Sequence, residues 1–172
     1  MIREFSRPVR VDTIGDGKRA VTISADEAER AAVAARFDLV AIDRLDADLS
    51  VWREGGGITV TGTILAAVTQ ACSVTDEPLA VRIEEPVALR FVETLDLADE
   101  IELEEAALDT VEIEGGIIDL GEAAAETMAL ALDPFPRGPN AAAVLRAAGV
   151  ISEEELVPYN ALAEALKAKL KK

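Results

Sequence analysis

Three long segments of the chain alternate apolar and polar residues with a period of two. Their apolar positions are Leu39, Ala41, Leu45, Ala47, Leu49 and Val51, then Ile58, Val60, Ile64, Ala66, Val68 and Cys72, then Val81, Ile83, Val87, Leu89 and Phe91. A strand that buries one face and exposes the other gives this alternation, which is typical of antiparallel sheets. Residues 39–92 therefore predict a twisted antiparallel β-meander, long enough to need a bulge or to curl toward a partial barrel.

The residues before the meander predict a strand and a helix. Phe5–Val11 is typical of a short edge strand, because Pro8 is tolerated only at an edge. Ser24–Glu27 has the spacing of a capping box, which would open an Ala-rich helix that runs to about Phe37.

The segment 110–136 predicts a strand, a glycine turn, a capped helix and a proline-rich exit. Asp119 can cap the helix, and Glu122 can reach back to the cap in a D-x-x-E capping box. Leu120, Ala124, Met128 and Ala131 would form its buried stripe. The residues that define this unit are Gly116, with a positive φ in the turn, Asp119, Leu120 and Glu122 in the helix, and Pro134 and Pro136 at its end.

Residues 141–148 predict a short helix that ends at Gly149, and residues 152–172 predict a helical tail. We therefore expect one α+β domain over residues 1–172, because nothing in the sequence marks a boundary. Its parts are the meander at about 39–92, an acidic segment at 93–106, the strand-turn-helix unit at 110–136 and the C-terminal tail. The helices should pack on the face and the ends of the sheet.

Charge adds a functional clue to this fold. The chain has 33 acidic and 17 basic residues, a net charge of −16. Between Phe91 and Pro136 there are 14 acidic residues and no Lys or Arg, and the densest run contains Glu100, Glu102, Glu104 and Glu105. Two interpretations stay open, a solvated acidic loop or a surface that attracts a basic partner. Both disfavour nucleic acid, because the net charge repels phosphate.

The types of residue present exclude most enzyme chemistry. The chain has no histidine, which removes the usual general base near neutral pH and the commonest metal ligand. Gly55–Gly57 lacks the following Lys-Ser/Thr of a phosphate-binding loop. We expect Cys72 to be an inert buried thiol, with Asp76 and Glu77 opposing any fall in its pKa. Paired carboxylates leave a hydrolase as a minor alternative, with no catalytic residue and no cofactor to name.

The sequence also indicates where the protein works. No apolar run approaches the ~20 residues that span a bilayer, and the N-terminus has no apolar signal region. The single cysteine fits a reducing compartment. We expect a cytoplasmic protein without membrane contact.

The sequence of residues 112–136, EIEGGIIDLGEAAAETMALALDPFP, resembles a motif of the YceD family of bacterial and plastid proteins, called large ribosomal RNA subunit accumulation proteins. In that family G-x-I-D-L…E…LALP-x-P stands in the same place. The turn after Cys72, the acidic segment and the ending Pro158–Leu162 followed by Leu166 and Lys167 keep the family's order. The resemblance covers most of the chain from Leu39 onward.

The resemblance bears directly on Cys72. Many family members carry C-x-x-C at the end of this strand and further cysteines near the C-terminus, which suggests a tetrahedral zinc site in them. This chain keeps Cys72, has Thr75 at the second position and lacks the later cysteines. One thiolate without an imidazole cannot form such a site. We therefore predict a metal-free protein in which residues 75–78 hold the turn by hydrogen bonds.

The resemblance implies a role in the accumulation of large-subunit ribosomal RNA. Our first hypothesis is a non-enzymatic factor in large ribosomal subunit biogenesis that binds a basic ribosomal protein or assembly factor through its acidic residues. A second hypothesis is direct RNA binding through Arg3, Arg7, Arg10 and the four lysines near the C-terminus. We expect no DNA partner.

Overall fold

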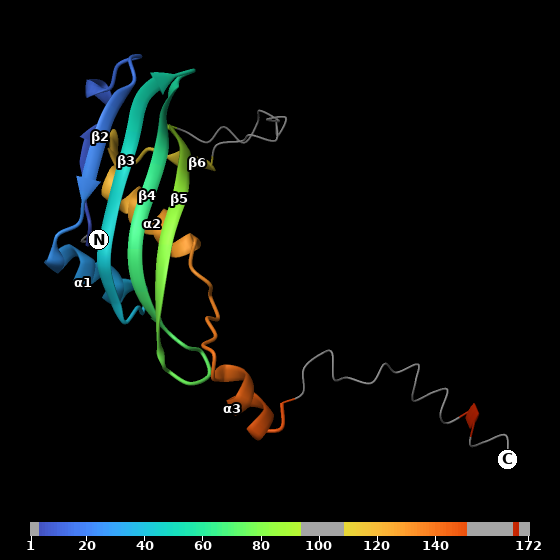
Figure 1. The fold of residues 1–172 in the computed structure, drawn as a ribbon. Helices are drawn as coiled ribbons and strands as arrows, with labels where there is room; N and C mark the ends of the chain where they lie inside the picture. Colours follow the sequence, from blue (N-terminus) through green and yellow to red (C-terminus); the bar gives the residue numbers. More distant parts are fainter. Residues whose placement is uncertain (1–3, 94–108, 151–166, 169–172) are drawn as a thin grey trace.

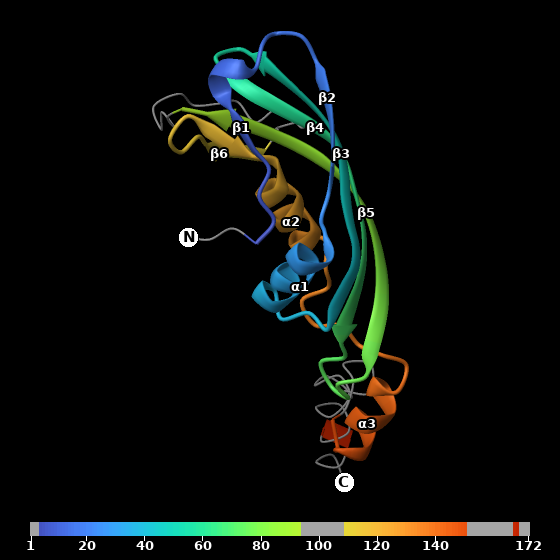
Figure 2. The same cartoon turned by 90° about the vertical axis from the view of Figure 1, so that its left-hand side faces the viewer.

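A computed structural model describes residues 4–93, 109–150 and 167–168 of the chain. Its centre is a five-stranded sheet in the order β2-β3-β4-β5-β6. The strands are β2 (Arg19–Ser24), β3 (Ala41–Glu54), β4 (Gly57–Ala71), β5 (Pro78–Val92) and β6 (Asp109–Glu112). Figures 1 and 2 show that this sheet is long, curved and open, with α1 (Glu27–Arg36) and α2 (Leu120–Leu130) on its concave side. The predicted α+β fold is confirmed, and the sheet does not close into a barrel.

β3, β4 and β5 form the antiparallel meander that the alternation predicts. Leu45 of β3 and Ile58 of β4 are almost completely buried, as expected for the inner face. The prediction for the start of β3 is wrong, because a register shift between Ile42 and Arg44 marks a β-bulge. Ile42 therefore packs in the core, whereas Ala41 is only half-buried. An extra residue in one strand reverses the alternation on its far side, and this accounts for the difference.

The two edge strands of the sheet depart from the predicted meander. β2 pairs antiparallel with β3, but only Ile23 of its six residues is buried, so its alternation is weak. β6 supplies the strand expected near 110–114, but it pairs parallel with β5. The sheet is thus antiparallel except at this last pair.

The capping box of α1 lies two residues later than predicted. Asp26 caps the helix by accepting a hydrogen bond from the Glu29 N–H, and the Glu29 carboxylate accepts one from the Asp26 N–H, both at 2.9 Å. Ser24 belongs to β2, and its hydroxyl donates to Asp46 on β3. Residues 24–27 and 26–29 both have the spacing of a capping box. Because Ser24 pairs with Asp46 in the sheet, the helix begins after Asp26 instead.

The N-terminal segment forms a second, two-stranded sheet. β1 (Pro8–Arg10) pairs antiparallel with β7 (Ile117–Asp119) just before α2. The Phe5 side chain is buried in the core, and the Phe5 backbone packs closely against the start of α2 at Gly121. A Cβ atom on Gly121 would lie 2.5 Å from the Phe5 carbonyl oxygen, so this close approach requires glycine.

After α2 the chain runs along the turn between β4 and β5. The Ser73 N–H donates to the Pro136 carbonyl at 2.8 Å, and the Gln70 side chain donates to the Asp133 carbonyl at 3.0 Å. α3 (Ala141–Ala147) follows, and Gly149 after it has the positive φ expected at a helix end. Of the predicted tail at 152–172, only residues 167–168 lie within the described part of the chain.

Candidate functional site

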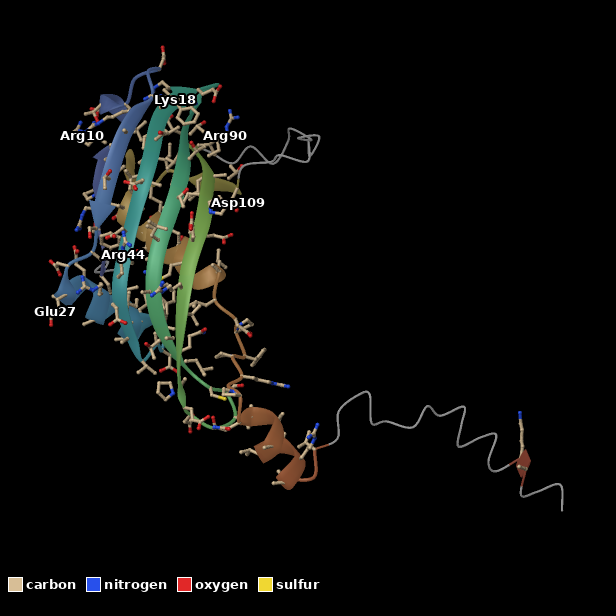
Figure 3. All side chains as sticks on the ribbon, viewed as in Figure 1. Arg10, Lys18, Glu27, Arg44, Arg90 and Asp109 are labelled. Carbon is tan, nitrogen blue, oxygen red and sulfur yellow. The ribbon has the colours of Figure 1, made fainter. Side chains whose placement is uncertain are left out.

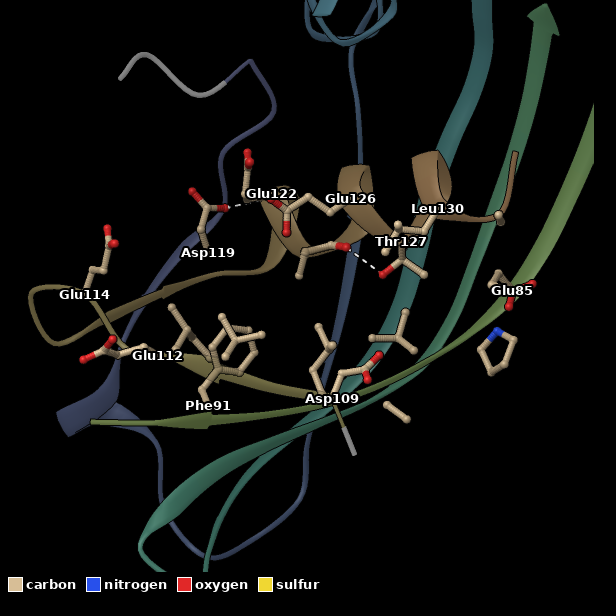
Figure 4. Close-up of a pocket in the computed structure, with 18 of the residues that line it drawn as sticks. Glu85, Phe91, Asp109, Glu112, Glu114, Asp119, Glu122, Glu126, Thr127 and Leu130 are labelled. Carbon is tan, nitrogen blue, oxygen red and sulfur yellow. Dashed lines mark hydrogen bonds between the residues drawn. The ribbon is translucent and has the colours of Figure 1, made fainter. Parts of the chain in front are cut away.

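A groove opens between α2 and the sheet edge that β5 and β6 form (Figure 4). Its volume is about 850 Å³, within the usual range for ligand-binding pockets. β5 and β6 line one side, α2 lines the other, and β7 with the turn before it closes one end. The groove therefore depends on the strand-turn-helix unit that the sequence singles out.

Asp119 fixes the start of α2 at this end of the groove. Its Oδ1 accepts hydrogen bonds from the N–H groups of Arg7 at 2.8 Å, Gly121 at 3.0 Å and Glu122 at 3.2 Å. Its Oδ2 accepts one from the Ser6 hydroxyl. The predicted N-cap is thereby confirmed, and the same carboxylate also ties the N-terminal segment to the helix.

The floor of the groove is apolar. Val87 and Phe91 of β5 and Ile118 of β7 are buried there. Three further apolar side chains line the groove but are exposed: Val111 by 38%, Ile117 by 42% and Leu130 by 86%. These three apolar side chains are thus left uncovered by the described residues beside the groove.

Carboxylates form both rims of the groove, and no Lys or Arg is among the described residues that line it. Figure 4 shows Asp119, Glu122 and Glu126 on the α2 side, across the apolar floor from Asp109 and Glu112. Among the described residues, the acidic side chains that line the groove are Glu85, Asp109, Glu112, Glu114, Asp119, Glu122 and Glu126.

On the α2 rim, part of the negative charge is compensated from outside the groove. Arg36 of α1 contacts Glu122 Oε1 at 2.7 Å, Glu4 at 3.4 Å and Glu126 at 3.8 Å. The hydrogen bond with Glu122 is the main cause that raises the pKa of Arg36. The prediction that Glu122 reaches back to its cap is wrong, because the Arg36 guanidinium offers a stronger, charged partner. Glu122 Oε2 is buried without a hydrogen-bond partner among the described residues.

The opposite rim, the strand rim, consists of Glu85 of β5, Asp109 and Glu112 of β6 and Glu114 in the turn before β7. Glu85, Asp109, Glu112 and Glu114 form no ion pair with any residue in the described ranges. Like charges held close together repel, and a cation brought between the rims relieves that repulsion. The described lining of the groove therefore combines an apolar floor with negatively charged rims.

Glu85 also lines the groove, although the sequence predictions did not single it out. It occupies an odd-numbered position of β5, between the buried Ile83 and Val87, so it lies on the inner face of the sheet. A charged residue in the middle of an otherwise apolar face is unexpected for a structural strand. That break in the alternation, together with the acidic stretch from Phe91 to Pro136, could have indicated the groove.

Among the remaining residues predicted for the helix unit, Ala131 lines the groove, whereas Gly116, Leu120, Pro134 and Pro136 do not. Gly116 has the expected positive φ in its turn, and Leu120 is fully buried in the core. Ala131 is exposed at the C-cap of α2, which corrects the predicted stripe. Pro134 and Pro136 follow the helix as predicted. Glu100, Glu102, Glu104 and Glu105 are not among the described residues.

Cys72 lies away from the groove, at the turn between β4 and β5. Its buried sulfur accepts a hydrogen bond from the Gly138 N–H at 3.2 Å. That bond, followed by hydrogen bonds from Thr75 and the Val74 amide, lowers the pKa of Cys72 to about 7. The expected influence of Asp76 and Glu77 on this pKa is wrong, because the amides that point at the sulfur stabilise its thiolate.

The predicted hydrogen bonds of this turn are present. The Cys72 N–H donates to the Glu77 carbonyl at 2.8 Å, and the Thr75 hydroxyl donates to the Glu77 carboxylate at 3.0 Å. Within residues 4–93, 109–150 and 167–168, no group of three or more His, Cys, Asp or Glu is placed to hold a metal ion. The absence of zinc stays a prediction.

The open curved sheet and the groove at its edge define the class, a small α+β protein with an acid-lined cleft. A family model described as Large ribosomal RNA subunit accumulation protein YceD matches residues 60–165, more than half of the chain. The chain belongs to the YceD family, and the family description implies involvement in large-subunit ribosomal RNA accumulation. All residues that line the groove lie within the matched range.

Two further comparisons add no relative. No curated protein and no solved structure matches the chain. In the described segments, no helix has both the length and the apolar character needed to cross a membrane.

Proposed function

We propose that this protein is a non-enzymatic factor of large ribosomal subunit biogenesis that works in the cytoplasm by binding a basic protein. The observation that supports the proposal is the groove, whose described lining residues combine an apolar floor with seven carboxylates and include no Lys or Arg. Apolar contact supplies affinity, and complementary charge favours encounter with the right partner.

A basic protein fits this site better than RNA does. The groove would meet RNA phosphates with carboxylates, whereas binding to nucleic acid depends on neutralising phosphate. Figure 3 shows Arg10, Lys18 and Arg90 toward one end of the sheet and Arg44 further along it. These side chains have partners within the protein: Arg10 pairs with Asp12, Lys18 lies over the Trp52 ring, Arg90 donates to the Gly55 carbonyl and Arg44 pairs with Asp46.

Arg7, another arginine of the RNA-binding alternative, is also engaged within the fold, whereas Arg3 lies outside the described residues. Arg7 donates to both carboxylate oxygens of Glu29, at 2.6 and 2.9 Å, and to the Ser24 carbonyl at 2.9 Å. A bidentate pair of this kind fixes the guanidinium in the fold. Arg7 would have to break it to reach a phosphate.

In this role the protein would act as an escort. Bound in the groove, the basic segment of a ribosomal protein or assembly factor has its charge neutralised until it meets ribosomal RNA. RNA then competes through its own dense phosphate charge, so release requires no reaction. The escort thereby supports accumulation of the large-subunit RNA without contacting it.

The proposal is tested by affinity purification of the tagged protein from its own cells at low salt with crosslinking. Proteins are identified by mass spectrometry and RNA by sequencing, with and without nuclease. We expect basic large-subunit proteins that remain after nuclease treatment and that are lost as salt increases. Large-subunit RNA crosslinked directly, with those proteins lost after nuclease, would support the RNA-binding alternative instead.

A further inference from the structure

We infer that the groove receives a basic amphipathic α-helix from the partner, with apolar side chains on the floor and Lys or Arg side chains toward both rims. This inference rests on the proposed function and specifies the form of the partner. Three features of the groove support it: the edge of β5, the stripe on α2 and the distribution of charge.

The edge of β5 is poorly suited to adding another strand. The Ile113 N–H donates to the Val92 carbonyl, so the backbone groups of Val92 point toward β6. Backbone direction alternates along a strand, so Ala88 and Pro86 also direct their groups to this edge. β6 begins opposite Leu89, which leaves the stretch of β5 beside the groove unpaired by any described strand. Pro86 has no N–H to donate there, and proline at an edge blocks strand addition.

The exposed side of α2 presents contacts at helical spacing. Glu122, Glu126 and Leu130 line the groove at intervals of four residues, about 6 Å apart along the axis. A helix that lies beside α2 repeats its own side chains at the same interval, so basic and apolar groups can meet this stripe in register. Leu130, 86% exposed, then becomes an apolar contact at the mouth.

The size of the groove agrees with a helix. A helix about 10 Å in diameter that rises 1.5 Å per residue occupies about 120 Å³ per residue. The groove volume of about 850 Å³ is therefore comparable to the volume of about seven helical residues, so the groove is large enough to admit a segment of this size. A longer helix would fit with one face inside. Binding by an apolar stripe in a groove is a common mode for amphipathic helices.

The charge distribution indicates where the cations of the helix lie. Arg36 already compensates part of the α2 rim, whereas Glu85, Asp109, Glu112 and Glu114 pair with no described cation. The strand rim should therefore contribute most to recognition of Lys and Arg. A helix with basic residues on both flanks of its apolar stripe matches this arrangement.

The test measures binding of two synthetic peptides to the full chain by fluorescence anisotropy. One peptide has Leu at i, i+3, i+4 and i+7 with Lys on both flanks, and the other is a permutation with the same composition and no stripe. We expect the striped peptide to bind at least tenfold more tightly than the permuted one and to gain helical circular dichroism when bound. Equal affinity for the two peptides would overturn the inference.

Two sets of four substitutions locate the site. E85Q/D109N/E112Q/E114Q removes four charges from the strand rim, and D16N/E27Q/D43N/E84Q removes four exposed charges that do not line the groove. The rim set should weaken binding of the striped peptide at least tenfold, and the control set less than about threefold, because it changes only the long-range field. An equal loss with both sets would mean that net charge, not the groove, holds the peptide.

A single substitution tests the apolar contact without threatening the fold. Leu130→Ala should weaken binding three- to tenfold at an unchanged melting temperature, because the Leu130 side chain is already exposed. Val144→Ala on α3, where Val144 is 45% exposed outside the groove, is the matched control and should have no effect. No loss with Leu130→Ala would exclude a helix seated beside α2.

Further outcomes separate other occupants from the inferred one. A striped peptide that binds in the groove without gaining helicity would identify an extended segment, which leaves the proposed function intact and overturns the helix. If K167Q/K169Q/K171Q/K172Q raises peptide affinity tenfold, the lysines of the chain itself compete for the groove and the assignment to a partner fails. If the affinity purification recovers no basic protein, the proposed function itself is overturned.

Discussion

At the scale of single residues, Asp119 connects two distant parts of the sequence. Its carboxylate accepts hydrogen bonds from two N–H groups at the start of α2 and from the N–H and hydroxyl groups of the N-terminal segment. The cap could be predicted, because D-x-x-E before an apolar helical stripe is a local pattern. The contacts with Ser6 and Arg7 could not, because they come from a distant part of the sequence.

Asp119→Ala should lower the free energy of unfolding by about 2–3 kcal/mol, since it removes a helix cap and leaves buried N–H groups unsatisfied. Asp119→Asn keeps an acceptor and should cost less. Urea unfolding followed by circular dichroism measures both. A loss below about 0.5 kcal/mol for the alanine variant would mean that water replaces the carboxylate at this site.

The thiol of Cys72 should titrate with a pKa of about 7, because the Gly138 amide stabilises its thiolate. Thiolate absorbance at 240 nm against pH, with Cys72→Ala as the blank, measures this midpoint. A folded-state pKa below that of the unfolded thiol adds stability above pH ~8.5, and this gain is lost as pH falls through about 7. The wild type should therefore lose stability relative to Cys72→Ala between pH 9 and 7. A midpoint near 8.5 would contradict the hydrogen bond.

At the scale of elements, the alternation predicted β3, β4 and β5 because each buries mainly one face along most of its length. The alternation did not predict strands that bury few residues or that pair with strands distant in the sequence. β2 buries one residue, β6 pairs parallel, and β1 finds its partner in β7. The length of the strands predicted that a bulge could occur, but not where. Its position after Ile42 depends on the register with β4.

The packing of the N-terminal segment on α2 gives a prediction at this scale. Gly121→Ala should destabilise the protein by about 1–3 kcal/mol, because the new methyl group would meet the Phe5 carbonyl and force a backbone shift. Gly17→Ala is the matched control, since a Cβ on Gly17 would have no atom within 4 Å. Thermal melts compare the two variants. Equal stability would show that the segment moves away from α2 without cost.

At the scale of the whole molecule, the fold concentrates part of the net charge of −16 around the groove. The sequence indicated an acidic surface, but it attributed that surface mainly to residues 93–106. The folded chain gathers other carboxylates, from β5, β6, β7 and α2, around one groove. This juxtaposition depends on the parallel pairing of β5 and β6, so the spacing of residues along the chain could not reveal it.

The two acidic sets can be compared directly. The set Glu100, Glu102, Glu104 and Glu105, changed to Gln, should weaken binding to a basic protein through the long-range field. The rim set of Glu85, Asp109, Glu112 and Glu114 should weaken it more, because those carboxylates line the groove. Kd values of the basic protein recovered from the purification, measured at two salt concentrations, give the comparison. A larger effect from residues 100–105 would place the interface outside the groove.

Metal content tests another property of the whole molecule. We predict that protein purified without added metal contains no stoichiometric zinc and that EDTA leaves its melting temperature unchanged, because one thiolate without histidine cannot complete a tetrahedral site. Elemental analysis by mass spectrometry checks this. One zinc ion per chain would contradict the prediction.

The most direct test of the central claim, that the groove binds a basic protein, is site-specific photocrosslinking in cells. A photoreactive amino acid replaces Leu130 in the groove or, as the control, Val144 on α3, both of which are exposed. We predict that position 130 crosslinks to a basic large-subunit protein or assembly factor and that position 144 does not. Crosslinks from position 130 to ribosomal RNA, or equal protein crosslinks from both positions, would contradict it.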